Sequence, residues 1–312
     1  MTQALLWIGF LLFIAGMLIL DLKVLQKKDH EIQIKEALLW TFFWIALSLL
    51  FNVGIYFYMG FDYALEFLTG YLIEKALSVD NIFVFIIIFT YFSVPPRYQH
   101  KVLFWGILGA IIMRAVFIFA GVALIQRLHW VIYILGAFLI YIGIKMAFAK
   151  EKKIHPERNP VLRTFNKLYP VDYDYKGNKF FIKKAGKLVA TPLFVVLIVI
   201  ETTDIVFAVD SIPAILSITL HPFIVFTSNI FAILGLRALY FAVSGIMKLF
   251  KFLNYGLSII LVFVGVKMLI SDFYKIPVSI ALAVVGIILA GSIILSLIAT
   301  RNEKKNNEKI SK

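Results

Sequence analysis

The sequence contains no cysteine and few charged residues for its length. Without cysteine, disulfide bonds and thiolate metal ligands are excluded. Only 16% of the 312 residues are charged, whereas 62% are hydrophobic. Apolar runs of about 20 residues exclude an ordinary soluble domain and are typical of membrane-spanning helices. The sequence therefore predicts an all-α polytopic membrane protein.

Nine segments are apolar and long enough to be predicted as transmembrane helices. They cover residues 3–20, 37–59, 71–92, 102–125, 130–149, 188–218, 223–246, 254–271 and 276–299. The first has no basic region before it and no small-residue cleavage site after it, so we expect a retained helix rather than a signal peptide. The histidines fall at or near the predicted loops, which argues against an imidazole site in the membrane. They are His30, His100, His129, His155 and His221.

The net charge of +13 would suggest nucleic acid in a soluble protein, but here the basic residues follow one face of the membrane. Alternate loops carry 24 Lys and Arg residues on one side and 2 on the other. Under the positive-inside rule the amino terminus is outside, and the 150–187 loop and the carboxyl tail are cytoplasmic. The lipid bilayer is the expected surrounding, and nucleic acid is not an expected partner.

Two of the predicted spans carry carboxylates, which are rare inside a membrane. The acidic residues are Glu74 and Asp80 in one span and Glu201, Asp204 and Asp210 in another. A carboxylate at bilayer depth costs at least about 2.5–3.5 kcal/mol, so such residues usually line a polar pathway. They indicate a route for cations.

The acidic segments belong to an internal repeat with a sequence offset of 122–124 residues. The matched stretches are 78–83 with 202–207, 112–117 with 235–240, and 141–146 with 263–268. Each copy holds three predicted spans, an odd number, so the second copy should run in the opposite direction across the membrane. Inverted repeats of this kind place a transporter site at their interface near the bilayer midplane. Asp80 and Asp204 are equivalent in the two copies.

We therefore divide the chain into six regions. They are two helices in 1–70, a three-helix repeat in 71–149, a basic loop in 150–187, the inverted repeat in 188–271, a last helix in 272–299 and a disordered cytoplasmic tail in 300–312.

On an ideal helix Glu201 and Asp204 share a face, whereas Asp210 lies on the opposite side. One site that uses all five acids therefore needs bent or broken helices, and Pro213 supplies a cause beside Asp210. Two neighbouring sites used in sequence are the alternative.

The available ligands are all oxygen atoms, with Asn81 and Ser211 as auxiliary ligands beside the carboxylates. Such a set suits hard cations such as Mn²⁺, Mg²⁺ or Ca²⁺ better than Cu⁺ or Zn²⁺. No resident cofactor is expected. Arg114 and Arg237 are central in their spans and are the expected charge partners of the acids. Each is either part of a structural ion pair or a tethered cation that replaces the substrate when the site is empty.

The motif Glu74-x5-Asp80-Asn81, together with Glu201-x2-Asp204-x5-Asp210-Ser-Ile-Pro, resembles the TerC family of integral membrane proteins. The resemblance covers nearly all the predicted spans. It implies relatives in the bacterial cytoplasmic (inner) membrane that export manganese, and it implies that the five matching acids form the metal site. In bacilli it also implies a link to manganese supply for secreted enzymes, which would make the protein-export machinery a partner.

These observations predict a transporter, not an enzyme, that exports a divalent cation, Mn²⁺ first, by alternating access. One alternative is an antiporter for another hard cation, Ca²⁺ or Na⁺. Others are an intramembrane hydrolase that uses paired aspartates as acid and base, and an assembly factor for exported proteins.

Overall fold

The computed structural model describes residues 2–25, 34–128, 130–148, 169–172, 174–175, 177–184, 186–244 and 252–310. Within these ranges some residues are described by their backbone alone. They are Asp80, Phe83, Asp210, Asn254 and residues 2–3, 21–25 and 301–310.

The described chain is mainly helical, with one short β-hairpin. The helices are α1 (Thr2–Leu25), α2 (Ile34–Met59), α3 (Phe61–Tyr91), α4 (Pro96–Arg127), α5 (Val131–Phe148), α7 (Pro192–Leu216), α8 (Pro222–Leu234), α9 (Leu236–Ser244), α10 (Leu253–Leu269) and α11 (Val278–Ile310). The hairpin pairs β1 (Phe181–Lys184) with β2 (Lys187–Ala190) in antiparallel register.

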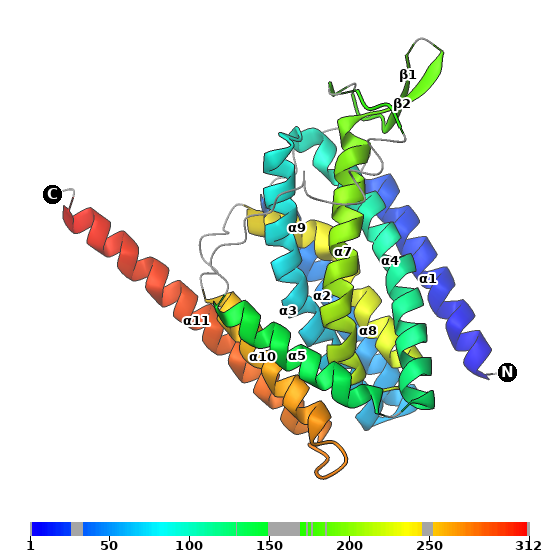
Figure 1. Cartoon of the computed structure of the whole chain (residues 1–312), viewed down its shortest axis with the longest axis vertical. Helices are drawn as coiled ribbons and strands as arrows, with labels where there is room; N and C mark the ends of the chain where they lie inside the picture. Colours follow the sequence, from blue (N-terminus) through cyan, green and yellow to red (C-terminus); the bar gives the residue numbers. More distant parts are fainter. Residues whose placement is uncertain are drawn as a thin grey trace.

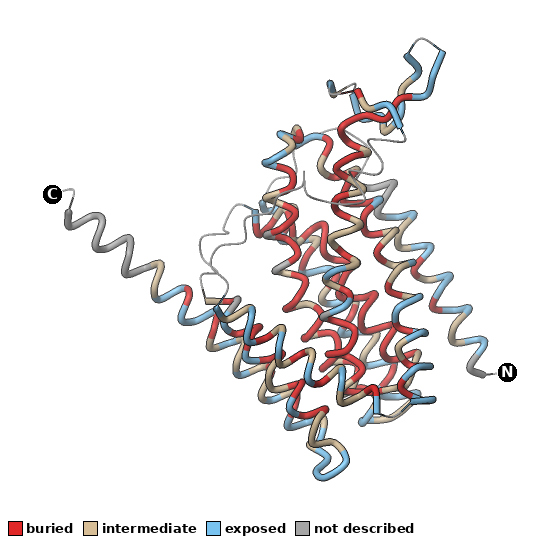
Figure 2. Tube along the Cα trace, viewed as in Figure 1, coloured by how far each residue is buried: buried red, intermediate tan, exposed pale blue. Residues whose placement is uncertain are grey.

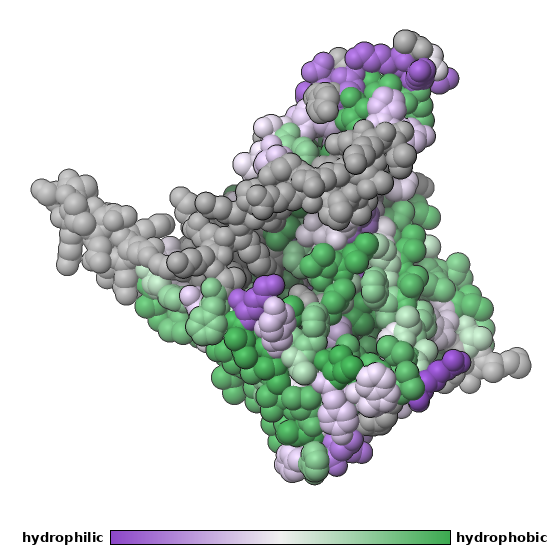
Figure 3. All heavy atoms as spheres, in the orientation of Figure 1, coloured by the Kyte–Doolittle hydropathy of each residue, from purple (hydrophilic) through white to green (hydrophobic). Residues whose placement is uncertain are grey.

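Six stretches of described helix are long and apolar enough to cross a membrane, and two more in α1 and α10 are apolar but shorter. On the face shown in Figure 3, hydrophobic residues cover the middle of the helical body and hydrophilic residues gather on the β-hairpin. The predicted class, a polytopic all-α membrane protein, therefore agrees with the structure.

The helices form a main body and an inclined group beside it (Figure 1). In the main body α3 packs against α7 and α8, and α4 packs against the same two helices. The inclined group consists of α5, α10 and α11, of which α10 contacts both others. Burial is concentrated in the interior of the main body, whereas α1 and the outer side of α11 are largely exposed (Figure 2). The acidic helices α3 and α7 therefore lie in the part of the molecule best shielded from the surroundings.

The two acidic helices, α3 and α7, begin at other residues than predicted. α3 begins at Phe61, after Gly60 with a φ of 105°, rather than at residue 71. The apolar pattern excluded this segment because it contains the charged residues Asp62 and Glu66, which the helix includes. α7 begins at Pro192 rather than at residue 188, because β2 continues to Ala190.

The expected helix break also lies elsewhere. α7 stays helical through Pro213 to Leu216, so Pro213 disturbs only the last turn of the helix. The segment predicted as one span over 223–246 is instead divided at Gly235 into α8 and α9. The break that was expected on α7 thus lies between α8 and α9, inside the main body.

The predicted tail and loop need correction too. α11 continues to Ile310, where we had expected disorder from residue 300, because this segment contains good helix formers such as Glu and Lys and no Gly or Pro. Most of the predicted basic loop, residues 149–168, lies outside the described residues. Its end forms the hairpin, which is anchored to the bundle by Phe181 against Phe194, with ring centroids 4.4 Å apart.

The contact between α5 and α10 depends on two glycines. A Cβ atom on Gly265 would lie 2.6 Å from the carbonyl oxygen of Gly136, and one on Gly136 would lie 2.9 Å from that of Gly265. Two turns after Gly136 on α5, Gly143 faces Ser258 of α10, whose hydroxyl donates to the Gly143 carbonyl at 2.5 Å. The two backbones can approach this closely only without side chains at these positions.

We therefore predict that Gly265→Ala lowers the unfolding free energy by about 1–3 kcal/mol, the usual cost of overpacking. Thermal unfolding of the purified protein in detergent measures this change. Gly286→Ala on α11 is the matched control, because a Cβ there has nothing within 4 Å. Equal stability of the two variants would contradict the packing derived for α5 and α10.

Candidate functional site

The centre of the site is the guanidinium of Arg114 on α4. It is completely buried, with 0% of the residue exposed. Its Nη1 forms an ion pair with Glu74 on α3, and its Nη2 lies 3.3 Å from Oδ1 of Asp204 on α7. Nε of Arg114 also donates to Oδ2 of Asp204 at 3.4 Å. One cation therefore joins the two acidic motifs, which lie far apart in the sequence.

Two neutral side chains complete the surroundings of Arg114. Ser211, two turns after Asp204 on the same face of α7, accepts a hydrogen bond from Nη1 at 3.4 Å. Asn229 on α8 accepts from Nη1 at 3.2 Å and donates to Oε2 of Glu74 at 3.1 Å. Four helices thus contribute to one hydrogen-bonded network.

Glu201 lies one turn from Asp204, in the α4–α7 interface. A Cβ atom on Gly109 of α4 would overlap the Glu201 carboxylate, so this glycine leaves the room that the carboxylate occupies. Glu201 and Asp204 also repel each other electrostatically. The predicted shared face of these two acids is confirmed by their common position against α4.

Other predicted site residues lie outside this network or outside the description. Asn81 and Arg237 are buried, on α3 and α9 respectively. The side chains of Asp80 and Asp210 are not among those described, so their roles as ligands stay predictions. Among the described side chains, no three carboxylate or histidine groups form a cluster able to hold a metal ion.

Asn229 is a site residue that the sequence analysis missed. The sequence does indicate a functional role for Asn229, because it is a polar residue in the middle of an apolar segment. The repeat concealed it, since the matching position in the first copy is Gly106, which has no polar side chain.

Lys75 stabilises the helix break next to this network. Its ammonium group donates to the carbonyl oxygen of Ala232 at 3.1 Å, within the last turn of α8. Gly235 leaves room for it, because a Cβ there would lie 3.0 Å from Nζ of Lys75. The last carbonyl groups of a helix have no partners within the helix and carry partial negative charge. Lys75 therefore holds the end of the helix that carries Asn229.

A small cavity of about 10 Å³ adjoins Asp204 on the side of the hairpin. It is lined mainly by apolar residues from α3, α4, α7, α8 and α9. They are Phe85, Leu103, Gly106, Ile107, Ala110, Ile200, Ile233 and Leu236. A cavity of this size admits at most one water molecule. The carboxylates are therefore enclosed, and the guanidinium group occupies the space between them.

This arrangement can bind one cationic group between two carboxylates that approach from different helices. A single positive charge faces the two carboxylates Glu74 and Asp204, so one formal negative charge remains. A divalent ion in place of the guanidinium group would neutralise both carboxylates. The amide and hydroxyl oxygens of Asn229 and Ser211, which accept hydrogen bonds from Arg114, are of the kind that hard cations prefer as ligands.

Comparison with known proteins identifies relatives across the whole length of the chain. The model of the integral membrane protein TerC family matches residues 59–304. An uncharacterized membrane protein of Myxococcus xanthus is 49% identical over 297 residues, which cover 95% of this chain and 93% of the relative. A protein of Salmonella typhi, named as a candidate membrane-bound redox modulator, Alx, is 47% identical over 96% of this chain and 97% of its own length. Its counterpart in Escherichia coli K12 is 46% identical over the same shares.

No solved structure matches the chain. The family match over most of the sequence, together with these identities, shows that the chain belongs to the TerC family of integral membrane proteins.

Proposed function

We propose that this protein is a transporter that exports a divalent metal cation, Mn²⁺ first, across the bacterial cytoplasmic membrane. The observation that carries the proposal is the buried guanidinium of Arg114 between Glu74 and Asp204. Charged groups this deep in a membrane protein are expensive and mark ion pathways.

In this proposal Arg114 is the tethered cation of the empty state. The metal displaces the guanidinium and is held by Glu74 and Asp204, with Asn229 and Ser211 as neighbouring oxygen ligands. Asp80, Glu201 and Asp210 are the further carboxylates of the pathway. When the metal leaves, Arg114 returns and offsets one of the two carboxylate charges, which lowers the cost of the empty site while the protein changes its direction of access.

The packing supports an inverted repeat. Exchanging the two copies converts α3 into α7, α4 into α8 with α9, and α5 into α10. If each helix is replaced by its counterpart, the contact between α4 and α7 becomes a contact between α8 and α3, which is also present. The contact between α5 and α10 becomes the same contact again. At an offset of 122 this exchange also carries the contact between Gly136 and Gly265 into that between Gly143 and Ser258. By the same exchange, the Arg114–Asp204 pair predicts a pair between Arg237 and Asp80.

A thiol-based redox role has no support in this chain. The name of the Alx relatives refers to redox modulation, but this sequence has no cysteine. The network also differs from an acid–base dyad, because a guanidinium group lies between Glu74 and Asp204.

We expect Glu74→Gln and Asp204→Asn each to abolish export while the protein still inserts, since a neutral amide is easier to place in a membrane than a carboxylate. The measurement is the metal content of cells, by element, with each variant in place of the wild-type protein. Manganese should rise in both variants, and zinc and copper should not, because an oxygen-only site favours hard cations.

Asp62→Asn is the control, since Asp62 is exposed at the start of α3. Wild-type manganese content in either site variant would contradict the shared site. A change in magnesium or calcium instead of manganese would keep the site and replace the substrate.

The proposed orientation places the hairpin end of the bundle in the cytoplasm. We expect Asn178→Cys, at the exposed turn before β1, to resist a membrane-impermeant thiol reagent on intact cells, whereas Phe273→Cys should react. Phe273 is 89% exposed in the α10–α11 loop at the other end of the bundle. The chain has no native cysteine, so the signal comes only from the introduced residue. Labelling of Asn178→Cys from outside would reverse the orientation.

A further inference from the structure

A second pair of opposite charges lies on α3 and α10, nearer the end of the bundle that is opposite the hairpin. Glu66 precedes Glu74 on α3 by two helical turns, a distance of about 12 Å along the axis. Thr219, in the α7–α8 loop, is a polar neighbour of the Glu66 carboxylate, which Lys267 of α10 attracts electrostatically and Asp62 of α3 repels. One carboxylate oxygen of Glu66, Oε2, is buried and has no hydrogen-bond partner among the described groups. Glu66 therefore keeps ligand capacity that the folded structure does not use.

Lys267 lies in the interior, contrary to expectation. A lysine near the end of a span usually extends its ammonium group to the membrane surface, and Lys145, its counterpart in the repeat, is exposed. Lys267 is only 7% exposed, and its ammonium group donates to the carbonyl of Ser217 at 3.0 Å. Ser217 ends α7, so Lys267 stabilises the last carbonyl groups of the helix that carries Asp204. The same lysine thus contacts the end of α7 and attracts Glu66.

The chain is tightly packed between the two charge pairs. A Cβ atom on Gly70 of α3 would lie 2.9 Å from the hydroxyl of Ser228 on α8 and 3.4 Å from Ile215 on α7. The contact separates Glu66 from Glu74 along α3, so the central site is closed toward this end of the bundle.

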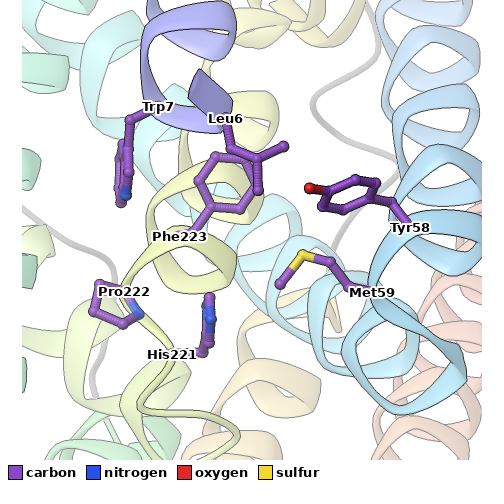
Figure 4. Close-up of a pocket in the computed structure, with 7 residues that line it drawn as sticks. All are labelled: Leu6, Trp7, Tyr58, Met59, His221, Pro222 and Phe223. Atoms are coloured by element: carbon purple, nitrogen blue, oxygen red, sulfur yellow. The ribbon is translucent and has the colours of Figure 1, made fainter. Parts of the chain in front are cut away.

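A pocket of about 280 Å³ lies at the same end of the bundle, with His221 at the start of α8 in its wall. Figure 4 shows that His221 and Tyr58 line it from different elements, together with Leu6, Trp7, Met59, Pro222 and Phe223. The backbone N–H of His221 donates to the hydroxyl of Thr219 at 3.1 Å. The wall of this pocket is therefore hydrogen-bonded to Thr219, the polar neighbour of Glu66.

We propose that Glu66 and Lys267 form the gate on the release side of the pathway, with Glu66 as a second, transient ligand for the exported cation. Lys267 neutralises Glu66 while the gate is closed, and the cation replaces Lys267 as it passes. This inference rests on the proposed transport of a divalent metal. The gate adds a transient cation-binding site outside the acidic motifs and assigns a role to the Oε2 atom of Glu66.

The test uses purified full-length protein, first in proteoliposomes for Mn²⁺ flux and then in detergent for Mn²⁺ binding by calorimetry. Glu66→Gln should lower the flux about tenfold, the effect of losing one charge-assisted contact in the rate-limiting step, with less change in affinity at the central site. Lys267→Met should leave Glu66 uncompensated, so that a second Mn²⁺ binds per chain. The double variant should bind one Mn²⁺ again.

Two controls separate the gate from a purely structural effect. Asp174→Asn removes an exposed carboxylate at the hairpin end of the bundle, and Lys145→Met removes the exposed counterpart of Lys267. Neither should change flux or stoichiometry. If Lys267 only caps α7, Lys267→Met loses stability without gaining a second bound Mn²⁺, and the gate is refuted.

Wild-type flux in Glu66→Gln would also refute the gate while leaving the proposed function intact. Absence of Mn²⁺ flux and binding in the wild-type protein would overturn the proposed function and the gate together.

Discussion

The buried ion pair of Arg114 with Glu74 and Asp204 is the interaction on which the site depends. It joins α4 to α3 and α7, and Asn229 extends the network to α8. Removing one partner of a buried pair typically costs about 3–5 kcal/mol, yet well-packed apolar residues in place of the whole network are often neutral or stabilising. Stability alone therefore does not require these charges. A site that must exchange one cation for another does require them, because the carboxylates need a positive partner in both states.

Two buried lysines extend the same physical principle to helix ends. Lys75 donates to a carbonyl in the last turn of α8, and Lys267 donates to the carbonyl that ends α7. A helix end inside an apolar body leaves carbonyl groups without partners, and a cation is the group that best offsets their partial charge. The two helices that end in this way carry Asn229 and Asp204, so the lysines help to position two residues that contact Arg114. Their charge also makes these helix ends sensitive to any other cation that approaches.

Much of this arrangement could be predicted from the sequence, since polar residues in long apolar segments are easy to recognise. The motif acids Glu74, Asp204 and Glu201, and the partner role of Arg114, followed from their depth in the predicted spans. The family followed from the same motifs. The break at Gly235 was missed because the segment is apolar on both sides of it, and a glycine in a helix is usually only a packing position. The inward direction of Lys267 could not be predicted, because it depends on the position of the α7 end, a tertiary contact that local sequence does not contain.

In the proposed mechanism, a metal ion and the guanidinium group of Arg114 compete for the same carboxylates, Glu74 and Asp204. The most direct measurement is the stabilisation of purified Arg114→Gln and wild-type protein by Mn²⁺ in thermal unfolding. The variant should be less stable without metal, because Glu74 and Asp204 then face each other without a cation. Mn²⁺ at about 100 times the dissociation constant of the variant should restore about 2.7 kcal/mol. The same Mn²⁺ concentration should stabilise the wild-type protein less, because there the ion must first displace Arg114. A variant that Mn²⁺ stabilises no more than the wild-type protein would contradict this account.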